Sequence, residues 1–174
     1  MSGTVPKYHW DTNLFTAWLK DERRPPGEMD GLQKVLEANA RNENMIMTSS
    51  ITVAEIKAGV LSTADGRKKL DRVLLRPNLL VINVDLRIAS LAGEIKSYYL
   101  SHPRTISLGD AVQCATAILH DADELHTFDD RGTRTSVGLI EISGNVAGQY
   151  NLTITKPFEK QAELNLQKPA EAKK

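Results

Sequence analysis

Apolar residues recur three and four positions apart over residues 108–122, which is the most regular pattern in the chain. This spacing is typical of a helix that buries one face, and it predicts an amphipathic helix with Asp110 at its start. A short strand should follow over residues 124–128 and end at the acidic pair Asp129 and Asp130. Because a helix and the strand after it usually pack antiparallel, we expect Asp110 and Asp129 at one edge of the fold.

Short apolar runs alternate with helical stripes along the rest of the chain. Further strands are expected at residues 7–10, 45–49, 79–84, 138–143 and 151–155. Helices are expected after Asp11, over residues 29–42, from Thr52, over residues 64–75 and after Asp85. The continuous apolar run at 79–84 is typical of a strand buried on both faces. Strands separated by helices predict an α/β domain with a mainly parallel sheet.

The chain has 174 residues, 41% of them hydrophobic, which suits one domain and is too short for two ordinary ones. Residues 1–155 are predicted to form that domain. Residues 156–174 are rich in Lys, Glu, Ala and Gln and are predicted to be a charged tail. The sequence shows no membrane-spanning run and no signal-peptide pattern at its start, so we expect a cytoplasmic protein without membrane contact.

The charge balance argues against a non-specific nucleic-acid coat protein, and the cysteine count excludes a disulfide-stabilised fold. Basic and acidic residues both number 22, so the formal net charge is zero, unlike a strongly basic nucleic-acid coat protein. Arg131 and Arg134 nevertheless follow the acidic pair directly and are candidate RNA-binding residues. Cys114 is the only cysteine, which excludes an internal disulfide, and its place on the apolar helix predicts a packed thiol.

Four acidic residues are expected at one edge of the sheet. Ligands of open α/β sheets bind outside the carboxyl ends of the strands. Asp11, Glu55 and Asp129 follow the first, second and fourth strands, and Asp110 begins a helix at the same edge. Each has a structural alternative: Asp11 and Asp110 suit helix starts, Asp129 suits a turn, and Glu55 fits a capping box with Thr52.

The electrostatic cost of bringing four carboxylates together favours a functional role. Two like charges about 4 Å apart repel by roughly 4 kcal/mol at an effective dielectric near 20, whereas a helix cap contributes about 1 kcal/mol. A convergent cluster therefore requires a cation, and oxygen ligands suit Mg²⁺ or Mn²⁺. Such a site is suited to phosphodiester hydrolysis by a metal-activated water. No histidine has the partners of a catalytic triad in the sequence pattern.

Three motifs follow one another in the chain. They read WDTNLF at residues 10–15, SSITVAEIKAG at 49–59 and SLGDAVQCATAILHDADELHTFD at 107–129. Together, over residues 8–142, they resemble the PIN-domain nucleases, in particular the VapC-type toxins of bacterial toxin-antitoxin pairs. The resemblance implies a five-stranded parallel sheet flanked by helices on both faces and a Mg²⁺- or Mn²⁺-dependent endoribonuclease. It also implies that Asp11, Glu55, Asp110 and Asp129 bind metal and that Thr12 and Asn13 orient the site.

The resemblance further implies an RNA substrate, a homodimer and a small antitoxin that inserts a segment into the cleft. Operator DNA would be contacted only through the antitoxin complex. Asp130 is a second acid where the family pattern has a basic or polar residue, and it is a candidate substitute for Asp129. The segment from Gly144 onward lies beyond the usual family length.

Two alternative functions share features with this sequence. The chain could be a catalytically inactive PIN-like binding module acting through protein or nucleic-acid contacts. A phosphatase of the haloacid dehalogenase type also begins with an Asp at a strand end, but it needs a second Asp two residues later. Asn13 occupies that position.

Overall fold

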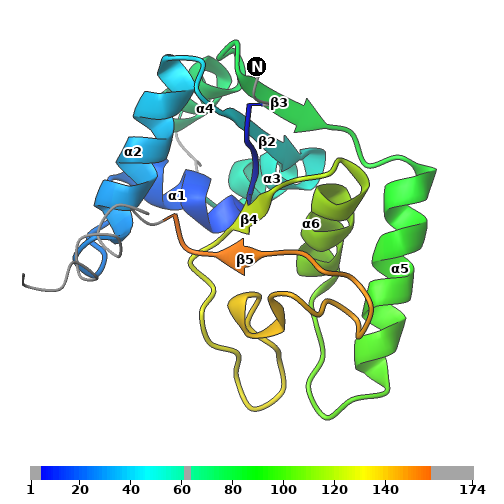
Figure 1. Cartoon of the computed structure of the whole chain (residues 1–174). Coiled ribbons are helices and arrows are strands. Elements are labelled where there is room, and N and C mark those ends of the chain that lie inside the picture. The colour runs from blue at the N-terminus through cyan, green and yellow to red at the C-terminus, as the bar shows by residue number, and fades with distance from the viewer. Residues whose placement is uncertain (1–4, 61–63, 158–174) are drawn as a thin grey trace, which may run out of the picture.

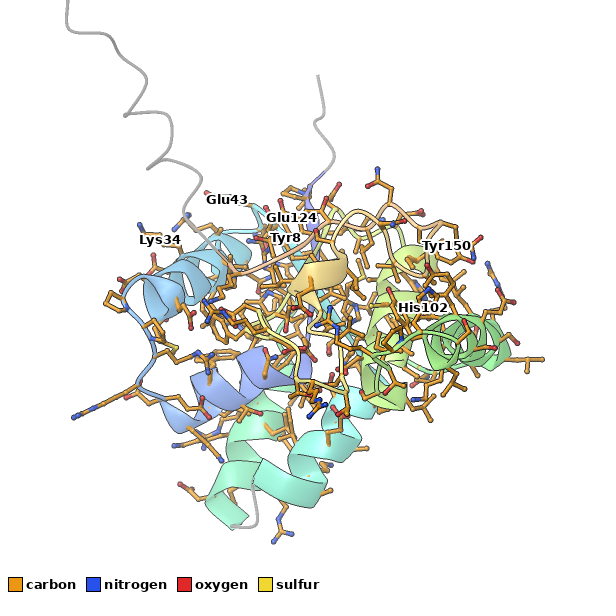
Figure 2. All side chains as sticks on the ribbon, turned by 90° about the horizontal axis from the view of Figure 1, so that it is seen from below. Tyr8, Lys34, Glu43, His102, Glu124 and Tyr150 are labelled. Carbon is orange, nitrogen blue, oxygen red and sulfur yellow. The ribbon has the colours of Figure 1, made fainter. Side chains whose placement is uncertain are left out.

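The computed structural model describes residues 5–60 and 64–157 and is built on a five-stranded sheet (Figure 1). The strands are β1 (Lys7–Trp10), β2 (Met45–Ser49), β3 (Leu79–Ile82), β4 (Glu124–His126) and β5 (Ile154–Thr155). Their order is β3-β2-β1-β4-β5, and every neighbouring pair is parallel. Tyr8 of β1 and Glu124 of β4 are paired in this register and lie side by side in Figure 2. The predicted α/β class and parallel sheet are confirmed.

Six α-helices flank the sheet in the described part of the chain. They are α1 (Thr12–Lys20), α2 (Glu28–Ala40), α3 (Ser50–Glu55), α4 (Ala64–Leu74), α5 (Leu86–Leu100) and α6 (Leu108–Leu119). A π-helical turn, η1 (Ile56–Val60), continues α3. Figure 1 shows α1 and α2 on one side of the sheet and α5 and α6 on the other. The predicted arrangement with helices on both faces is therefore confirmed.

The alternation of side chains along the strands creates two separate cores. In β2, Ile46 packs with residues of α1, α2 and α4, whereas its neighbour Met47 packs with residues of α5 and α6. Successive side chains of a strand point to opposite faces, so a central strand needs apolar residues at nearly every position. This requirement accounts for the apolar residues on both faces of β2. The expectation that the run at 79–84 is buried on both faces is wrong, because β3 lies at the edge of the sheet and Leu80 is 48% exposed.

Side-chain caps begin the helices that follow the strands. Asp85 accepts a hydrogen bond from the Ile88 amide at 2.9 Å, as predicted for the helix after the third strand. The capping box expected for Thr52 and Glu55 is wrong. The helix begins earlier, at Ser50, and Ser49 caps it by accepting from the Ile51 amide at 3.3 Å.

Two predicted strands end earlier than their apolar patterns suggested, because side chains replace the next strand as hydrogen-bond partners. Beyond β4, the Phe128 amide donates to Asn13 Oδ1 at 3.0 Å. Beyond β3, the Val84 amide donates to Ser50 Oγ at 3.2 Å. Both side chains belong to helix starts at the same edge of the sheet, where the strands give way to the site described below.

The strand predicted at residues 138–143 is wrong, since this segment contains a short 3₁₀ helix, η2 (Ile140–Ile142). The strand beside β4 is β5 instead. Asp129 also holds the segment in a turn: its carboxylate accepts from the Leu139 amide at 2.9 Å and its carbonyl from the Ile140 amide at 3.1 Å.

Three further predictions concern the buried cysteine, membrane spans and the C-terminal tail. Cys114 is fully buried and burial raises the pKa of its thiol, which confirms the packed thiol. Within residues 5–60 and 64–157, no helix has the length and apolar character needed to cross a membrane. Of the predicted tail at 156–174, only Lys156 and Pro157 lie within the described residues.

Candidate active site

A pocket of about 500 Å³ opens at the carboxyl edge of the sheet, where β1 and β4 end and α1, α3 and α6 meet. The four acids predicted from the sequence all line it, together with both predicted orienting residues. The lining residues are Asp11, Thr12, Asn13, Thr16, Glu22, Arg24, Glu55, Asp110, Phe128 and Asp129.

Asp11 is the most buried acid of the pocket, with 6% of its surface exposed. Its Oδ1 accepts from the Thr12 amide at 2.6 Å, and its Oδ2 accepts from Asn13 Nδ2 at 2.7 Å and Thr127 Oγ1 at 2.8 Å. Burial raises the pKa of Asp11 to about 7, against the lowering effect of the Thr127 hydrogen bond, and the charges of Asp110 and Glu55 raise it further. A cation in the pocket would favour the ionised form.

Asn13 and Thr127 join the ends of β1 and β4. The Asn13 amide group donates to Asp11 and to Thr127 Oγ1, and its carbonyl oxygen accepts from the Phe128 amide. Thr127 Oγ1 also accepts from the Asp129 amide at 3.0 Å. These bonds hold the Asp11 carboxylate and the backbone of Asp129 in one rigid unit.

Glu55 reaches the pocket from the end of α3. Its Oε2 accepts a short hydrogen bond from the Thr12 hydroxyl. Gly109 lies directly behind this carboxylate: a Cβ added at Gly109 would come within 2.7 Å of Glu55 Oε1. The observed position of the Glu55 carboxylate thus depends on the absence of a side chain at residue 109.

Buried polar side chains next to the pocket hold Thr12, and through it Glu55, by hydrogen bonds. Gln113 of α6 donates to Thr12 Oγ1 at 3.2 Å and to Thr52 Oγ1 at 2.9 Å. The Thr48 hydroxyl donates to the Trp10 carbonyl at 2.8 Å and is hydrogen-bonded to the Thr52 hydroxyl at 2.8 Å, and His9 Nε2 is bonded to Gln113 Oε1 at 2.8 Å. Burial lowers the pKa of His9 to about 4, although the bond to Gln113 opposes this effect. His9 is therefore a neutral structural residue at pH 7.

Asp110 lies in the first turn of α6, as the sequence predicted. Its Oδ2 accepts from Ser107 Oγ at 2.6 Å, and its amide donates back to the same hydroxyl at 2.9 Å. Ser107 is the N-cap of α6, so Asp110 does not serve as the cap itself. Its carboxylate is left facing the pocket.

Asp129 and Asp130 are turned to different surroundings. Asp129 lines the pocket, and burial raises the pKa of its half-buried carboxyl. Asp130 is exposed and forms an ion pair with Lys156 at 2.6 Å. Of the two, only Asp129 is among the residues that line the pocket.

The acids share the pocket without forming a closed metal cage. Across the described ranges, no three His, Cys, Asp or Glu side chains come together closely enough to hold a metal ion. Each carboxylate instead accepts its own hydrogen bond. The donors are the Thr12 amide for Asp11, the Thr12 hydroxyl for Glu55, the Ser107 hydroxyl for Asp110 and the Leu139 amide for Asp129. The atoms on the pocket wall that could bind a metal are nevertheless mainly carboxylate and hydroxyl oxygens, the ligand type that Mg²⁺ prefers.

Sequence reasoning missed several residues of the site. Arg24, from the loop before α2, and Phe128 line the pocket, whereas Arg131 and Arg134 are exposed and are not among its lining residues. Gln113 could have been found, because it lies three positions after Asp110 and so shares its side of the helix. Nothing in the local sequence pattern distinguishes Arg24 from its neighbour Arg23.

Comparison with known proteins places this geometry in a family. A sequence model of the PIN domain matches residues 8–137. A comparison with curated proteins gave no match.

Solved structures share the fold at low sequence identity. VapBC2 from Rickettsia felis, bound to a DNA fragment from its promoter, has 24% identity and a TM-score of 0.61, over 85% of this chain and 96% of that chain. FitAcB from Neisseria gonorrhoeae has 22% identity and a TM-score of 0.55, over 86% and 97%. A toxin-antitoxin complex from Klebsiella pneumoniae has 22% identity and a TM-score of 0.53, over 87% and 98%. With a parallel sheet, an acid-lined pocket at its carboxyl edge and a family match over most of its length, the chain belongs to the PIN domain family.

Proposed function

We propose that this protein is a Mg²⁺- or Mn²⁺-dependent endoribonuclease that hydrolyses phosphodiester bonds of RNA. The observation that carries the proposal is the meeting of Asp11, Glu55, Asp110 and Asp129 in one pocket of a PIN-domain chain. Asp11 caps α1 and Asp129 holds a turn, but helix capping does not account for Asp110 or Glu55, because Ser107 caps α6 and Ser49 caps α3.

The pocket fits a hard divalent cation by its donor chemistry. Mg²⁺ usually keeps several waters and binds one or two carboxylates together with substrate phosphates, so it does not need a closed protein cage. Asp11, Glu55, Asp110 and Asp129 are the residues that would hold it. When bound, the metal supplies an activated water and neutralises charge on the phosphoryl oxygens.

The side chains of the protein fix the carboxylates before substrate arrives. Asn13, Thr127 and the Thr12 amide hold Asp11 through three hydrogen bonds of 2.6–2.8 Å. Thr12 also orients Glu55, and Ser107 orients Asp110. Carboxylates that are positioned in advance need no reorganisation during the reaction, which is the main source of electrostatic catalysis.

We further propose that the enzyme is the toxin of a toxin-antitoxin pair that acts in the cytoplasm. One similar structure is a toxin-antitoxin complex and another includes promoter DNA. By analogy, this chain would form a homodimer, be neutralised by a small antitoxin, and contact operator DNA only through that complex.

The test of the nuclease proposal is the substitution Asp110→Asn, which removes a carboxylate charge and keeps its shape. RNA cleavage with Mn²⁺ and growth inhibition on expression should both be lost, while circular dichroism and the melting temperature stay close to wild type. Asp71→Asn, at an exposed position of α4, is the matched control and should keep full activity. Full cleavage by the Asp110→Asn variant would contradict the proposal.

A Mn²⁺ titration separates this proposal from the inactive binding module. Binding of the ion should raise the melting temperature of the wild-type protein and not that of the Asp110→Asn variant. If Mn²⁺ neither binds nor stabilises the wild type, the binding module becomes the better description of the protein.

A further inference from the structure

Arg24 introduces a positive charge into the wall of the acid pocket. It lies in the loop between α1 and α2, and among the described residues it is the only cationic side chain that lines the pocket. Five carboxylates line the same pocket, since Glu22 adds to the four acids proposed above. The position of this guanidinium among five carboxylates suggests a role beyond that of a solvated surface charge.

The Arg24 guanidinium is held on three sides. Its Cζ lies 4.1 Å from the centre of the Phe128 ring, Nε donates to Glu28 Oε2 at 2.9 Å, and Nη1 is 3.3 Å from Glu22 Oε2. The side chain keeps 24% of its surface exposed. An arginine stacked on a ring and bound by carboxylates loses its rotational freedom, so its remaining N–H groups have a defined direction.

Glu28 is itself supported by a residue from the far end of the domain. Its side chain is only 5% exposed, and Lys156 Nζ donates to Glu28 Oε1 at 2.7 Å and to Asp130 Oδ2 at 2.6 Å. A buried carboxylate needs paired charges, and Arg24 and Lys156 provide them. Lys156 follows β5 and lies outside residues 8–137, so the segment after the PIN match completes the support of Arg24.

The chemistry of this arrangement fits a phosphate group. A polyanion is repelled by a pocket lined with carboxylates, and a cation beside the reacting position offsets that repulsion. The guanidinium fork matches phosphate oxygens in a bidentate manner. Among the described residues its hydrogen bonds use Nε and Nη1, and none uses Nη2.

We propose that Arg24 binds a backbone phosphate of the RNA strand at the acid pocket, with Phe128 behind it and Glu28 and Lys156 holding it in place. This inference rests on the proposed ribonuclease function. Arg24 is then a substrate-binding residue, while Glu28 and Lys156 are positioning residues that act through it.

The experiment compares Arg24→Ala with Arg23→Ala, which removes the same charge from an adjacent, exposed position. Binding of a labelled single-stranded RNA of mixed sequence is measured against salt concentration in the Asp110→Asn background, and Mn²⁺-dependent cleavage in the wild-type background. Loss of one phosphate contact to a single strand should flatten the slope of log affinity against log salt by about 0.7. We expect that change for Arg24→Ala, together with about tenfold slower cleavage at low RNA concentration, and no change for Arg23→Ala.

Two further variants distinguish phosphate binding from a packing role. Arg24→Lys keeps the charge and should restore the salt slope, while cleavage recovers only in part, because lysine lacks the planar fork. Glu28→Gln should weaken RNA binding with Arg24 still present. Melting temperatures of all variants show whether each one folds.

The outcomes separate this inference from the proposed function. If the wild type cleaves RNA and Arg24→Ala has the same salt slope and cleavage rate as Arg23→Ala, the inference about Arg24 is overturned and the nuclease stands. If the wild type neither binds nor cleaves RNA, both proposals fail. A slope that Arg24→Lys does not restore would also count against phosphate binding.

Discussion

At the scale of single residues, neighbours in the sequence have different surroundings in the fold. Asp129 and Asp130 are adjacent carboxylates, but one lines the pocket and the other is paired with Lys156 at the surface. Arg23 and Arg24 divide in the same way, since only Arg24 lines the pocket. Composition and local pattern are the same within each pair, so only the contacts of each side chain assign its role.

The two acids after β4 provide a direct test. Asp129→Asn should lower RNA cleavage by about a hundredfold, because a charge at the pocket wall is lost while the amide oxygen can still accept from Leu139. Asp130→Asn should stay within about fivefold of wild type, since an exposed ion pair contributes about 1 kcal/mol or less. Cleavage rates of the two purified variants decide between them, and a larger loss for Asp130→Asn would show that it replaces Asp129.

At the scale of elements, the start of α6 leaves room for the carboxylate that reaches the pocket from the end of α3. Gly109 allows the Glu55 carboxylate to lie against the start of α6, where Asp110 also begins its turn. The loop after β4 is similarly tight, because a Cβ at Gly132 would lie 2.2 Å from the Ser136 carbonyl oxygen. This loop runs from Asp129 to η2, so its close packing fixes the backbone that carries the pocket acid.

Gly109→Ala should separate activity from stability. The new methyl group would lie 2.7 Å from Glu55 Oε1, the mobile end of a side chain, so the carboxylate should move away while the fold is kept. Alanine favours a helix over glycine by up to about 1 kcal/mol, so we expect unchanged or higher stability. Displacement of the carboxylate should reduce cleavage by about 10- to 100-fold.

Gly93→Ala in α5 is the matched control, because a Cβ at that exposed position meets nothing within 4 Å. It should stabilise the helix to a similar extent and leave RNA cleavage unchanged. Cleavage rates and melting temperatures of both variants are the measurements. Full activity of Gly109→Ala would show that the position of Glu55 is not critical.

At the scale of the whole molecule, a chain of charged groups ties the end of the domain to its beginning. Lys156 links Glu28 at the start of α2 with Asp130 after β4. Burial raises the pKa of Glu28, but hydrogen bonds from Lys156 and Arg24 outweigh this effect and hold the pKa below its ordinary value of 4.5. Protonation of Glu28 is therefore coupled to global unfolding.

The sign of that coupling predicts acid sensitivity. Because the pKa of Glu28 is lower in the folded than in the unfolded state, the unfolded chain takes up the proton first as the pH falls below about 4.5. The contribution of Glu28 to the free energy of unfolding is thus complete above that pH and is lost below it. Urea unfolding at pH 7 and at pH 3.5 measures this loss.

Glu28→Gln should be less stable than wild type by about 1 to 3 kcal/mol at pH 7, and the difference should shrink at pH 3.5. Glu43→Gln is the control: Glu43 pairs with Arg41 on an exposed surface, so its removal should change stability little at either pH. A constant difference between Glu28→Gln and wild type at both pH values would contradict the coupling.

Much of the fold was predictable because it follows from local burial. The strands at β1 and β2 and the helix after Asp85 match the apolar patterns of the sequence. The errors occurred where a side chain replaced a regular partner. Asn13 takes the Phe128 amide and Ser50 takes the Val84 amide, so β4 and β3 end early, and Asp129 holds residues 138–143 in a turn.

The sequence by itself determined the parallel α/β sheet and the meeting of Asp11, Glu55, Asp110 and Asp129, because strand ends in a parallel sheet share one edge. The tertiary structure alone decided which hydrogen bonds hold these acids, and that the basic side chain beside them is Arg24. Lys156 and Glu28 are 128 positions apart, and Thr127 and Asp11 are 116 apart. No helical or strand period encodes contacts at such separations, so the contacts around Arg24 form only when the whole sheet and its helices are assembled.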